Sequence, residues 1–215
     1  ANIIWVAQAY DTDGDGTQDD QAAEDFVRSL GYELDVQRGN WTTLDAAKID
    51  ALNAADLIII SRSTNSGDYA ANATEVSQWN GVTTPMILMT AYIARSSRWL
   101  WVNSTTINNF VEPTMDVLVR EHPIFTGVDL GASNQVTLVE GTTGTGQTSF
   151  IGSTDVGSGT ALVTTGTSTC IAEWPEGEPY YSGAGTPASN RMLFCAGTQE
   201  SGATPQGAFN LTEAG

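Results

Sequence analysis

The sequence predicts an α/β protein built on a doubly wound, mainly parallel sheet, with helices on both faces and an antiparallel β extension in the C-terminal third. Three observations predict this class. Short apolar runs alternate with segments of helical character over residues 2–92, as parallel strands joined by right-handed crossovers require. From about residue 134 short apolar runs are separated by Thr and Gly, without helical periodicity. Hydrophobic residues make up 40% of the 215 residues, enough for a sizeable core.

Four segments in the first half are predicted strands: the apolar runs NIIWVAQA (2–9), DLIIISRST (56–64) and PMILMTAY (85–92), and between the first two the segment ELDVQ (33–37). Three helices are predicted between them: DDQAAEDFVRSLGY (19–32), TTLDAAKIDALNAA (42–55) and a stretch around ATEVSQWNG (73–81). The first helix carries Ala22, Phe26 and Leu30 at four-residue spacing, which predicts its buried face. Thr42 or Thr43 is expected to cap the second helix. This order of elements predicts a flavodoxin-like fold.

Five later runs are predicted antiparallel strands that extend one edge of the sheet: QVTLVEG (135–141), TSFIGS (148–153), GTALVTTG (159–166), CIAEW (170–174) and RMLFCAG (191–197). Mixed sheets permit such an extension. No internal repeat or low-complexity linker divides the chain. The sequence therefore predicts a single domain over residues 1–215, with a parallel βα core at 1–130 and a β-rich extension at 131–215.

The two cysteines, Cys170 and Cys195, stand at the ends of two of these runs. If the runs pair antiparallel with Trp174 opposite Arg191, then Cys170 lies opposite Cys195, because both pairs of numbers have the same sum. Directly opposed residues are compatible with a disulfide, best in a non-hydrogen-bonded pair. A disulfide is the prediction, and two buried free thiols are the alternative.

Acidic residues greatly outnumber basic ones: 25 Asp and Glu against eight Lys and Arg give a formal net charge of -17. Such a chain repels nucleic-acid phosphates and anionic lipid surfaces, so no nucleic-acid partner is expected. Apolar runs such as LIII and MILM are far too short to cross a bilayer, so no membrane insertion is expected. The lysine-poor composition and the predicted disulfide favour a secreted, extracellular or cell-surface protein.

The stretch DTDGDGTQDD (11–20) follows the spacing of an EF-hand-like calcium loop. Its candidate ligands are Asp11, Asp13, Asp15, Thr17 through its carbonyl, and Asp19, with Gly16 at the turn. Position twelve, normally a bidentate Glu, is Ala22, so Asp20, Glu24 or water would take that place. Ca²⁺ is the predicted cofactor, since clustered carboxylates repel one another unless a hard cation neutralises them. A solvated acidic loop that caps the next helix and a pair of glycosidase carboxylates are the alternatives.

A ligand crevice is expected beyond the carboxyl ends of the strands, where open α/β sheets bind their ligands. The predicted ligand-binding residues are Arg62, Ser63, Asn65, Tyr92, Arg95 and Arg98, with Ser66 beside them. Arginine suits a carboxylate, and Trp99 or Trp101 would offer a stacking surface for a sugar. Alternatively, the arginines neutralise Asp68 and the acidic loop while both tryptophans belong to the core.

The single histidine, His122, precedes Pro123 and is expected to be structural. A His-dependent triad needs an activated nucleophile, and the sequence has neither a G-x-S-x-G elbow nor a plausible catalytic cysteine.

The succession LGYELDV, ADLIIISRST, PMILMTAY, REHPIFTGV and NLTEAG resembles a class I glutamine-amidotransferase-like, or trehalose-utilisation-like, flavodoxin-type domain of secreted bacterial proteins. The resemblance spans most of the chain, and HPIFTGV and the SRST strand end are its most distinctive parts. Active amidotransferases place a nucleophilic cysteine in a turn after a central strand. The corresponding turn here, TAYIARSS, has no cysteine, so that activity is not carried over. The family usually ends in a helix, and NLTEAG stops where that helix would begin, which is compatible with a piece of a larger multidomain protein.

Three functions follow as hypotheses. The first is a non-catalytic, calcium-stabilised extracellular module that binds a glycan or a partner protein. The second is a carbohydrate-active hydrolase that uses Glu140, Asp68 or the acidic loop with support from the arginines. The third is a structural component of a surface assembly, in which the Thr- and Gly-rich β region presents sheet edges to its neighbours.

Overall fold

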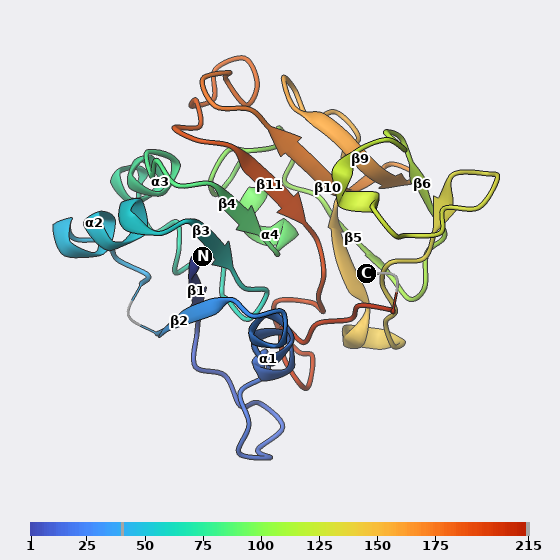
Figure 1. Cartoon of the computed structure of the whole chain (residues 1–215), viewed down its shortest axis with the longest axis horizontal. Coiled ribbons are helices and arrows are strands. Elements are labelled where there is room, and N and C mark those ends of the chain that lie inside the picture. The colour runs from blue at the N-terminus through green and yellow to red at the C-terminus, as the bar shows by residue number, and fades with distance from the viewer. Residues whose placement is uncertain (40, 214–215) are drawn as a thin grey trace.

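The computed structural model describes residues 1–39 and 41–213, and it folds them around one mixed sheet of eleven strands (Figure 1). The last two residues of the predicted domain, and with them the end of NLTEAG, lie outside the described part. Five strands are mutually parallel: β1 (Asn2–Ala7), β2 (Glu33–Arg38), β3 (Leu57–Ile60), β4 (Met86–Leu88) and β11 (Arg191–Phe194). Six more are added through antiparallel pairings: β5 (Ile107–Phe110), β6 (Met115–Val117), β7 (Gln135–Val136), β8 (Thr148–Ile151), β9 (Thr160–Thr165) and β10 (Ser168–Trp174).

The order of strands along the sheet is β2-β1-β3-β4-β11-β10-β9-β6-β7, with β8 on β10 and β5 on β8. The first five strands of this path have the order of a flavodoxin-like parallel core. Six of the ten pairings in the described chain are antiparallel, so the prediction of a mainly parallel sheet is wrong. Antiparallel strands begin at Ile107, ahead of residue 131, where the extension was expected to start.

Strand β11 differs most from expectation. The sequence assigned RMLFCAG to the antiparallel edge, but β11 lies inside the sheet, parallel to β4 and antiparallel to β10. An apolar run that is buried from both faces suits a central position, and it carries no local signal of which strand it will pair with. The structure therefore takes its fifth parallel strand from the C-terminal end of the chain.

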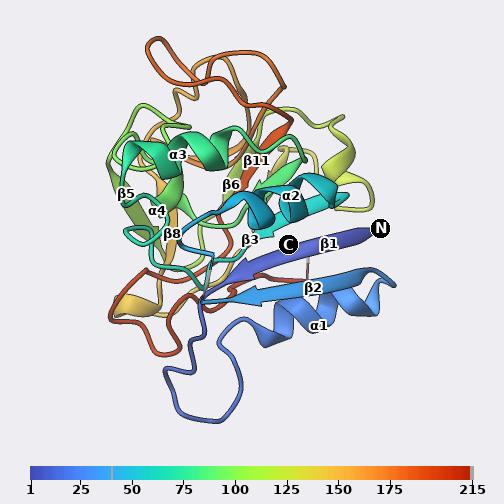
Figure 2. The ribbon, with the colours of Figure 1, turned by 90° about the vertical axis from the view of Figure 1, so that its left-hand side faces the viewer.

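Helices cover both faces of the parallel core, as predicted. They are α1 (Gln21–Ser29), α2 (Ala46–Ala54), α3 (Ala73–Asn80) and the short α4 (Ala91–Ala94), with 3₁₀ turns η1 (Pro123–Phe125) and η2 (Gly144–Gly146). Figure 2 shows α1 on one side of β1 and β2, and α2 and α3 on the other. Alternate residues of β1 face the two layers: Ile4 and Val6 join the larger core, while Ile3 and Trp5 join the smaller core beside α1.

Two local details of the helices differ from what the sequence predicts. The α1 face predicted to be buried is exposed: Phe26 is 62% and Leu30 58% accessible. Glu24 is buried instead, because it faces Arg38 of the sheet. In α2 the N-cap is Asp45, whose side chain accepts the Lys48 backbone N–H, and neither predicted threonine has that role.

The predicted antiparallel register between β10 and β11 is confirmed, with Trp174 opposite Arg191. Nevertheless Cys170 and Cys195 are free, fully buried thiols, so the predicted disulfide is not formed. The Cys195 N–H donates to the Cys170 carbonyl at 2.9 Å, which makes the two residues a hydrogen-bonded pair. Side chains stand farther apart in such a pair than in the non-hydrogen-bonded pair that suits a disulfide. Burial raises the pKa of the Cys195 thiol to about 12 and that of the Cys170 thiol well above its ordinary value, which favours the protonated form of both.

The tryptophans that follow α4 belong to the core. Trp99 and Trp101 are fully buried, and Trp99 stacks on Trp79 with ring centroids 5.1 Å apart. Trp101 stacks on Tyr180 at 5.7 Å, and its indole N–H donates to Asn80 Oδ1. Neither ring is accessible to a sugar, so the stacking role considered for them is wrong.

Candidate functional site

The carboxyl ends of β3, β4 and β11 are neighbours in the sheet, and side chains that follow them form what we call the strand-end site. It comprises Arg62, Ser66, Tyr92, Arg95, Arg98 and Glu200. Five of these six residues were singled out in the sequence. Glu200 was missed, because it follows β11, and only recognising β11 as a parallel strand would have placed Glu200 at this edge.

Arg62 forms the floor of the strand-end site and is 1% exposed. Its Nε donates to the Thr198 carbonyl at 2.6 Å and its Nη1 to the Thr64 carbonyl at 3.2 Å. Its Nη2 is buried without a hydrogen-bond partner in the described structure. Burial lowers the pKa of Arg62, and the nearby Glu200 opposes that shift. Arg62 is therefore a buried guanidinium with one nitrogen that lacks a hydrogen-bond partner and with no directly paired carboxylate among the described residues.

Ser66 connects the other charges of the strand-end site. Its backbone N–H and its hydroxyl both donate to the carboxylate of Glu200. Its Oγ accepts Arg95 Nη2 at 3.1 Å and Arg98 Nε at 3.3 Å. Ser66 is itself buried, so one small hydroxyl separates a carboxylate from two guanidinium groups.

Tyr92, at the start of α4, lies between two of the arginines. The Cζ atoms of Arg62 and Arg95 lie 5.1 Å and 5.2 Å from the centre of its ring. Such contacts are attractive because the face of the ring carries negative charge density. The phenol ring thus helps to hold two positive charges close together, although the chain as a whole is strongly negative.

The remaining predicted ligand residues lie at the border of this site. Ser63 is buried and its hydroxyl has no partner among the described residues. Asn65 is exposed, and its backbone N–H donates to Gln8 Oε1. Asp68 accepts Gln8 Nε2 at 2.6 Å. Within the described residues no arginine of the strand-end site forms an ion pair, so the arginines do not neutralise Asp68 or the acidic loop.

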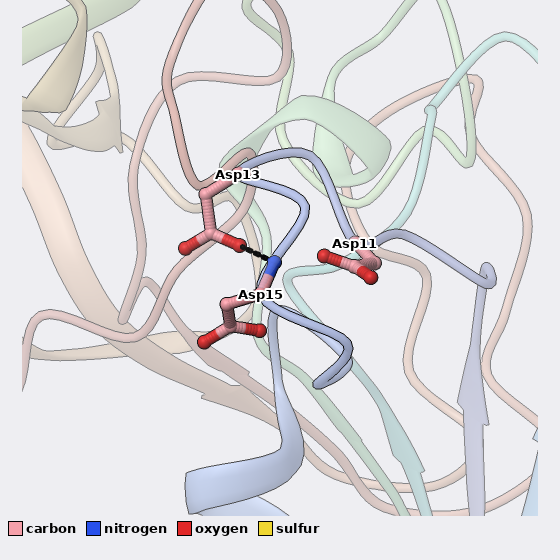
Figure 3. Close-up of side chains that lie close together, drawn as sticks. All are labelled: Asp11, Asp13 and Asp15. Carbon is pink, nitrogen blue, oxygen red and sulfur yellow. Dashed lines mark hydrogen bonds between the residues drawn. The ribbon is translucent and has the colours of Figure 1, made fainter.

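The acidic loop extends from the carboxyl end of β1, and three of its carboxylates lie together (Figure 3). One oxygen from each of Asp11, Asp13 and Asp15 lies within 4.8 Å of the others. Calcium–oxygen distances of ~2.3–2.6 Å place two ligands of one ion at most ~5 Å apart, so the spacing fits. Gly14 and Gly16 have φ of 76° and 86° and donate their N–H groups to Asp11, and this backbone turns the loop back on itself.

The other predicted metal ligands have different places. Thr17 is exposed and donates its N–H to Asp15 Oδ1. Asp19 closes the loop by accepting the N–H and hydroxyl of Thr12. Asp20 is fully buried, lies outside the exposed group of Asp11, Asp13 and Asp15, and accepts three hydrogen bonds from other protein groups.

The three donors to Asp20 come from three different strands or strand ends. They are Trp5 Nε1 at 2.8 Å, Ser61 Oγ at 2.7 Å and Arg38 Nη1 at 2.9 Å. Asp20 therefore fastens the start of α1 to β1, β2 and β3. Beside it, burial and then the negative charge of Asp20 raise the pKa of Glu24.

The acidic loop and the strand-end site are in contact. The segment 198–207, which follows β11 and which we call the lid segment, carries Glu200 and lies over Arg62. At its far end, the Gln206 N–H donates to Thr12 Oγ1 of the acidic loop at 2.7 Å. Figure 2 shows the two loops on the same side of the sheet, at the carboxyl ends of the parallel strands.

His122 and Glu140 make no contact with the strand-end site in the described structure. His122 Nδ1 accepts the Ile124 N–H, and its Nε2 lies 3.3 Å from Glu173 Oε2, in accord with a structural role. Glu140 is exposed, and its carboxylate has no hydrogen bond or ion pair among the described residues. The two acids considered for hydrolysis, Asp68 and Glu140, are therefore not linked by any contact.

Similarity to known proteins is found at the level of the fold. No described helix is long and apolar enough to cross a membrane. No family model and no curated protein matches the sequence. Among solved structures, the fold is similar to that of a ThuA-like protein from Bacteroides uniformis, with a TM-score of 0.56 and 12% identity over 93% of this chain and 82% of the other. The likeness supports the predicted flavodoxin-like fold at the level of architecture.

Proposed function

We propose that this protein is a non-catalytic, calcium-stabilised extracellular module that binds a glycan or a partner protein at the strand-end site. The observation that carries the proposal is the gathering of Arg62, Arg95 and Arg98 around Ser66 and Tyr92. None of the three has an ion-pair partner within residues 1–39 and 41–213. In a chain with a net charge of -17, three arginines that form no direct ion pair, and that meet Glu200 only through Ser66, favour a ligand site.

A non-catalytic role is supported by the residues that surround the site. The turn after β4 is Thr90-Ala91-Tyr92, and Thr90 uses its hydroxyl to cap α4. Both cysteines lie in the core, where burial keeps them protonated. The groups around Tyr92 are suited to holding charge, and none of them is an activated nucleophile.

A structural role for calcium is supported by the position of the acidic loop. The ion would draw Asp11, Asp13 and Asp15 together at the connection between β1 and α1. Because Thr12 of this loop holds the lid segment, an ordered loop would also stabilise one side of the strand-end site. The extracellular location stays a proposal that rests on the acidic composition.

The proposal is tested by calorimetry and by a glycan array on the whole chain. Calcium titrated into chelator-treated protein should release or absorb heat and raise the melting temperature, and Asp13→Asn should remove both effects. Asp116→Asn is the matched control, because Asp116 is an exposed acid of β6. Binding to the array should be lost in Arg95→Gln. Retention of all binding in that variant would refute the strand-end site as the binding surface.

A further inference from the structure

The acidic side chain of Glu200 occupies the strand-end site in the way an external carboxylate would. Its two oxygens accept the N–H and the O–H of one buried serine, Ser66. Glu200 itself is only half-buried, and its carboxylate forms no ion pair with any described arginine. The site therefore already recognises a planar pair of oxygens without using its strongest donors for that purpose.

Those stronger donors surround the same point. Arg95 donates through Nε to the Tyr92 carbonyl and through Nη2 to Ser66 Oγ. Arg98 donates through Nε to Ser66 Oγ and through Nη1 to the Ser97 carbonyl. Each guanidinium has five N–H groups, so each keeps donors that no residue of the described chain uses. Both side chains are partly exposed, so solvent and ligand can reach them.

The buried cation beneath adds to this attraction. Arg62 Nη2 has no partner, and a buried unpaired donor costs free energy unless something accepts from it. A Cβ at Gly197 would lie 2.1 Å from Arg62 Cγ, and one at Gly207 would lie 2.9 Å from the Arg62 carbonyl oxygen. The lid segment thus packs directly on Arg62.

The geometry points to a site for a ligand carboxylate, carried by an acidic sugar such as a uronic acid unit, that takes the place of Glu200 on Ser66 and pairs with Arg95 and Arg98. The inference rests on the proposed function, because it names the class of ligand for the same site. Glu200 is then an internal competitor, and its departure frees the Ser66 N–H and O–H for the ligand.

A carboxylate suits the site better than a phosphate for two reasons. The donors on Ser66 face two oxygens of one planar group, and arginine pairs with the same group in a bidentate manner. In addition, the strongly negative chain opposes a dianion more than a monoanion. Glucuronate is therefore the probe, with glucose as the neutral sugar and inorganic phosphate as the competing anion.

The experiment is calorimetric titration of the whole chain with glucuronate, glucose and phosphate. Glu200→Gln should bind glucuronate at least about tenfold more tightly than the wild type, since an internal competitor with charge-assisted hydrogen bonds is weakened. Arg95→Gln and Arg98→Gln should each weaken binding about tenfold or more. Arg120→Gln is the matched control, because Arg120 is exposed, lies outside the strand-end site and donates to the Gly131 carbonyl and to Asn134 Oδ1.

Several results would overturn the inference. If the wild type and Glu200→Gln bind glucuronate with equal affinity, Glu200 is not an internal competitor. If glucose and glucuronate bind with equal affinity, the site does not recognise the carboxylate. If phosphate binds more tightly than glucuronate, the ligand is a phosphate and not a carboxylate. If Glu200→Gln does not fold, the melting temperature of the wild type decides, because glucuronate should raise it and glucose should not. If these tests fail but binding to the glycan array still depends on Arg95, the inference about the carboxylate is refuted and the proposed function is not.

Discussion

Replacing Asp20 by alanine is expected to lower the free energy of unfolding by about 4 kcal/mol. Asp20 is fully buried and accepts hydrogen bonds from Trp5, Ser61 and Arg38. Truncation leaves the indole N–H and the serine hydroxyl unsatisfied, at ~1 kcal/mol each. Losing the carboxylate also removes one of the two partners of Arg38, at ~2 kcal/mol, which is less than for a fully broken pair because Glu24 still accepts from Arg38.

The assay is urea denaturation followed by tryptophan fluorescence, in chelator and in calcium. Asp25→Ala is the matched control, since Asp25 is an exposed acid of the same helix whose side chain is 64% accessible. Its loss should cost less than about 0.5 kcal/mol. A cost below about 1.5 kcal/mol for Asp20→Ala would refute the assignment of a structural anchor. So would a loss of the calcium-induced rise in stability in that variant, because Asp20 would then act as a metal ligand.

Three other predictions concern calcium, pH and the thiols. Asp11→Asn should reduce the calcium-induced rise in melting temperature in a thermal scan, while Asp155→Asn should not; a full response in the first variant would contradict the calcium loop. Burial raises the pKa of Glu75 above its ordinary 4.5, so its neutral form favours folding. Its contribution is therefore complete below pH 4.5 and is lost as the pH rises through the raised pKa. Urea midpoints of the wild type should accordingly fall more between pH 4 and pH 8 than those of Glu75→Gln, and parallel curves would count against this. Ellman's reagent should find no reactive thiol in the native protein and two after denaturation without reductant, whereas a disulfide would give none in either state.

Short-range patterns in the sequence were sufficient for the first half of the fold. The runs that became β1, β3 and β4 are continuous and apolar, β2 alternates apolar and polar residues, and the segments between them have helical character, so each element is determined by residues close in the chain. The register that places Trp174 opposite Arg191 was also predictable, because two adjacent runs of similar length can pair in few ways. The spacing of the acidic loop predicted that Asp11, Asp13 and Asp15 would lie together.

Tertiary contacts decided the rest, because they join residues far apart in the chain. The residues of RMLF do not by themselves predict that β11 will insert between β4 and β10. That insertion brings Glu200 to the strand-end site. Asp20 resembles its acidic neighbours in sequence, yet Trp5, Ser61 and Arg38 make it a buried anchor. In the same way, the hydrophobic period of α1 suggested a buried face. In the structure Glu24 instead faces Arg38 of the sheet, and with this orientation of α1 Phe26 and Leu30 are exposed.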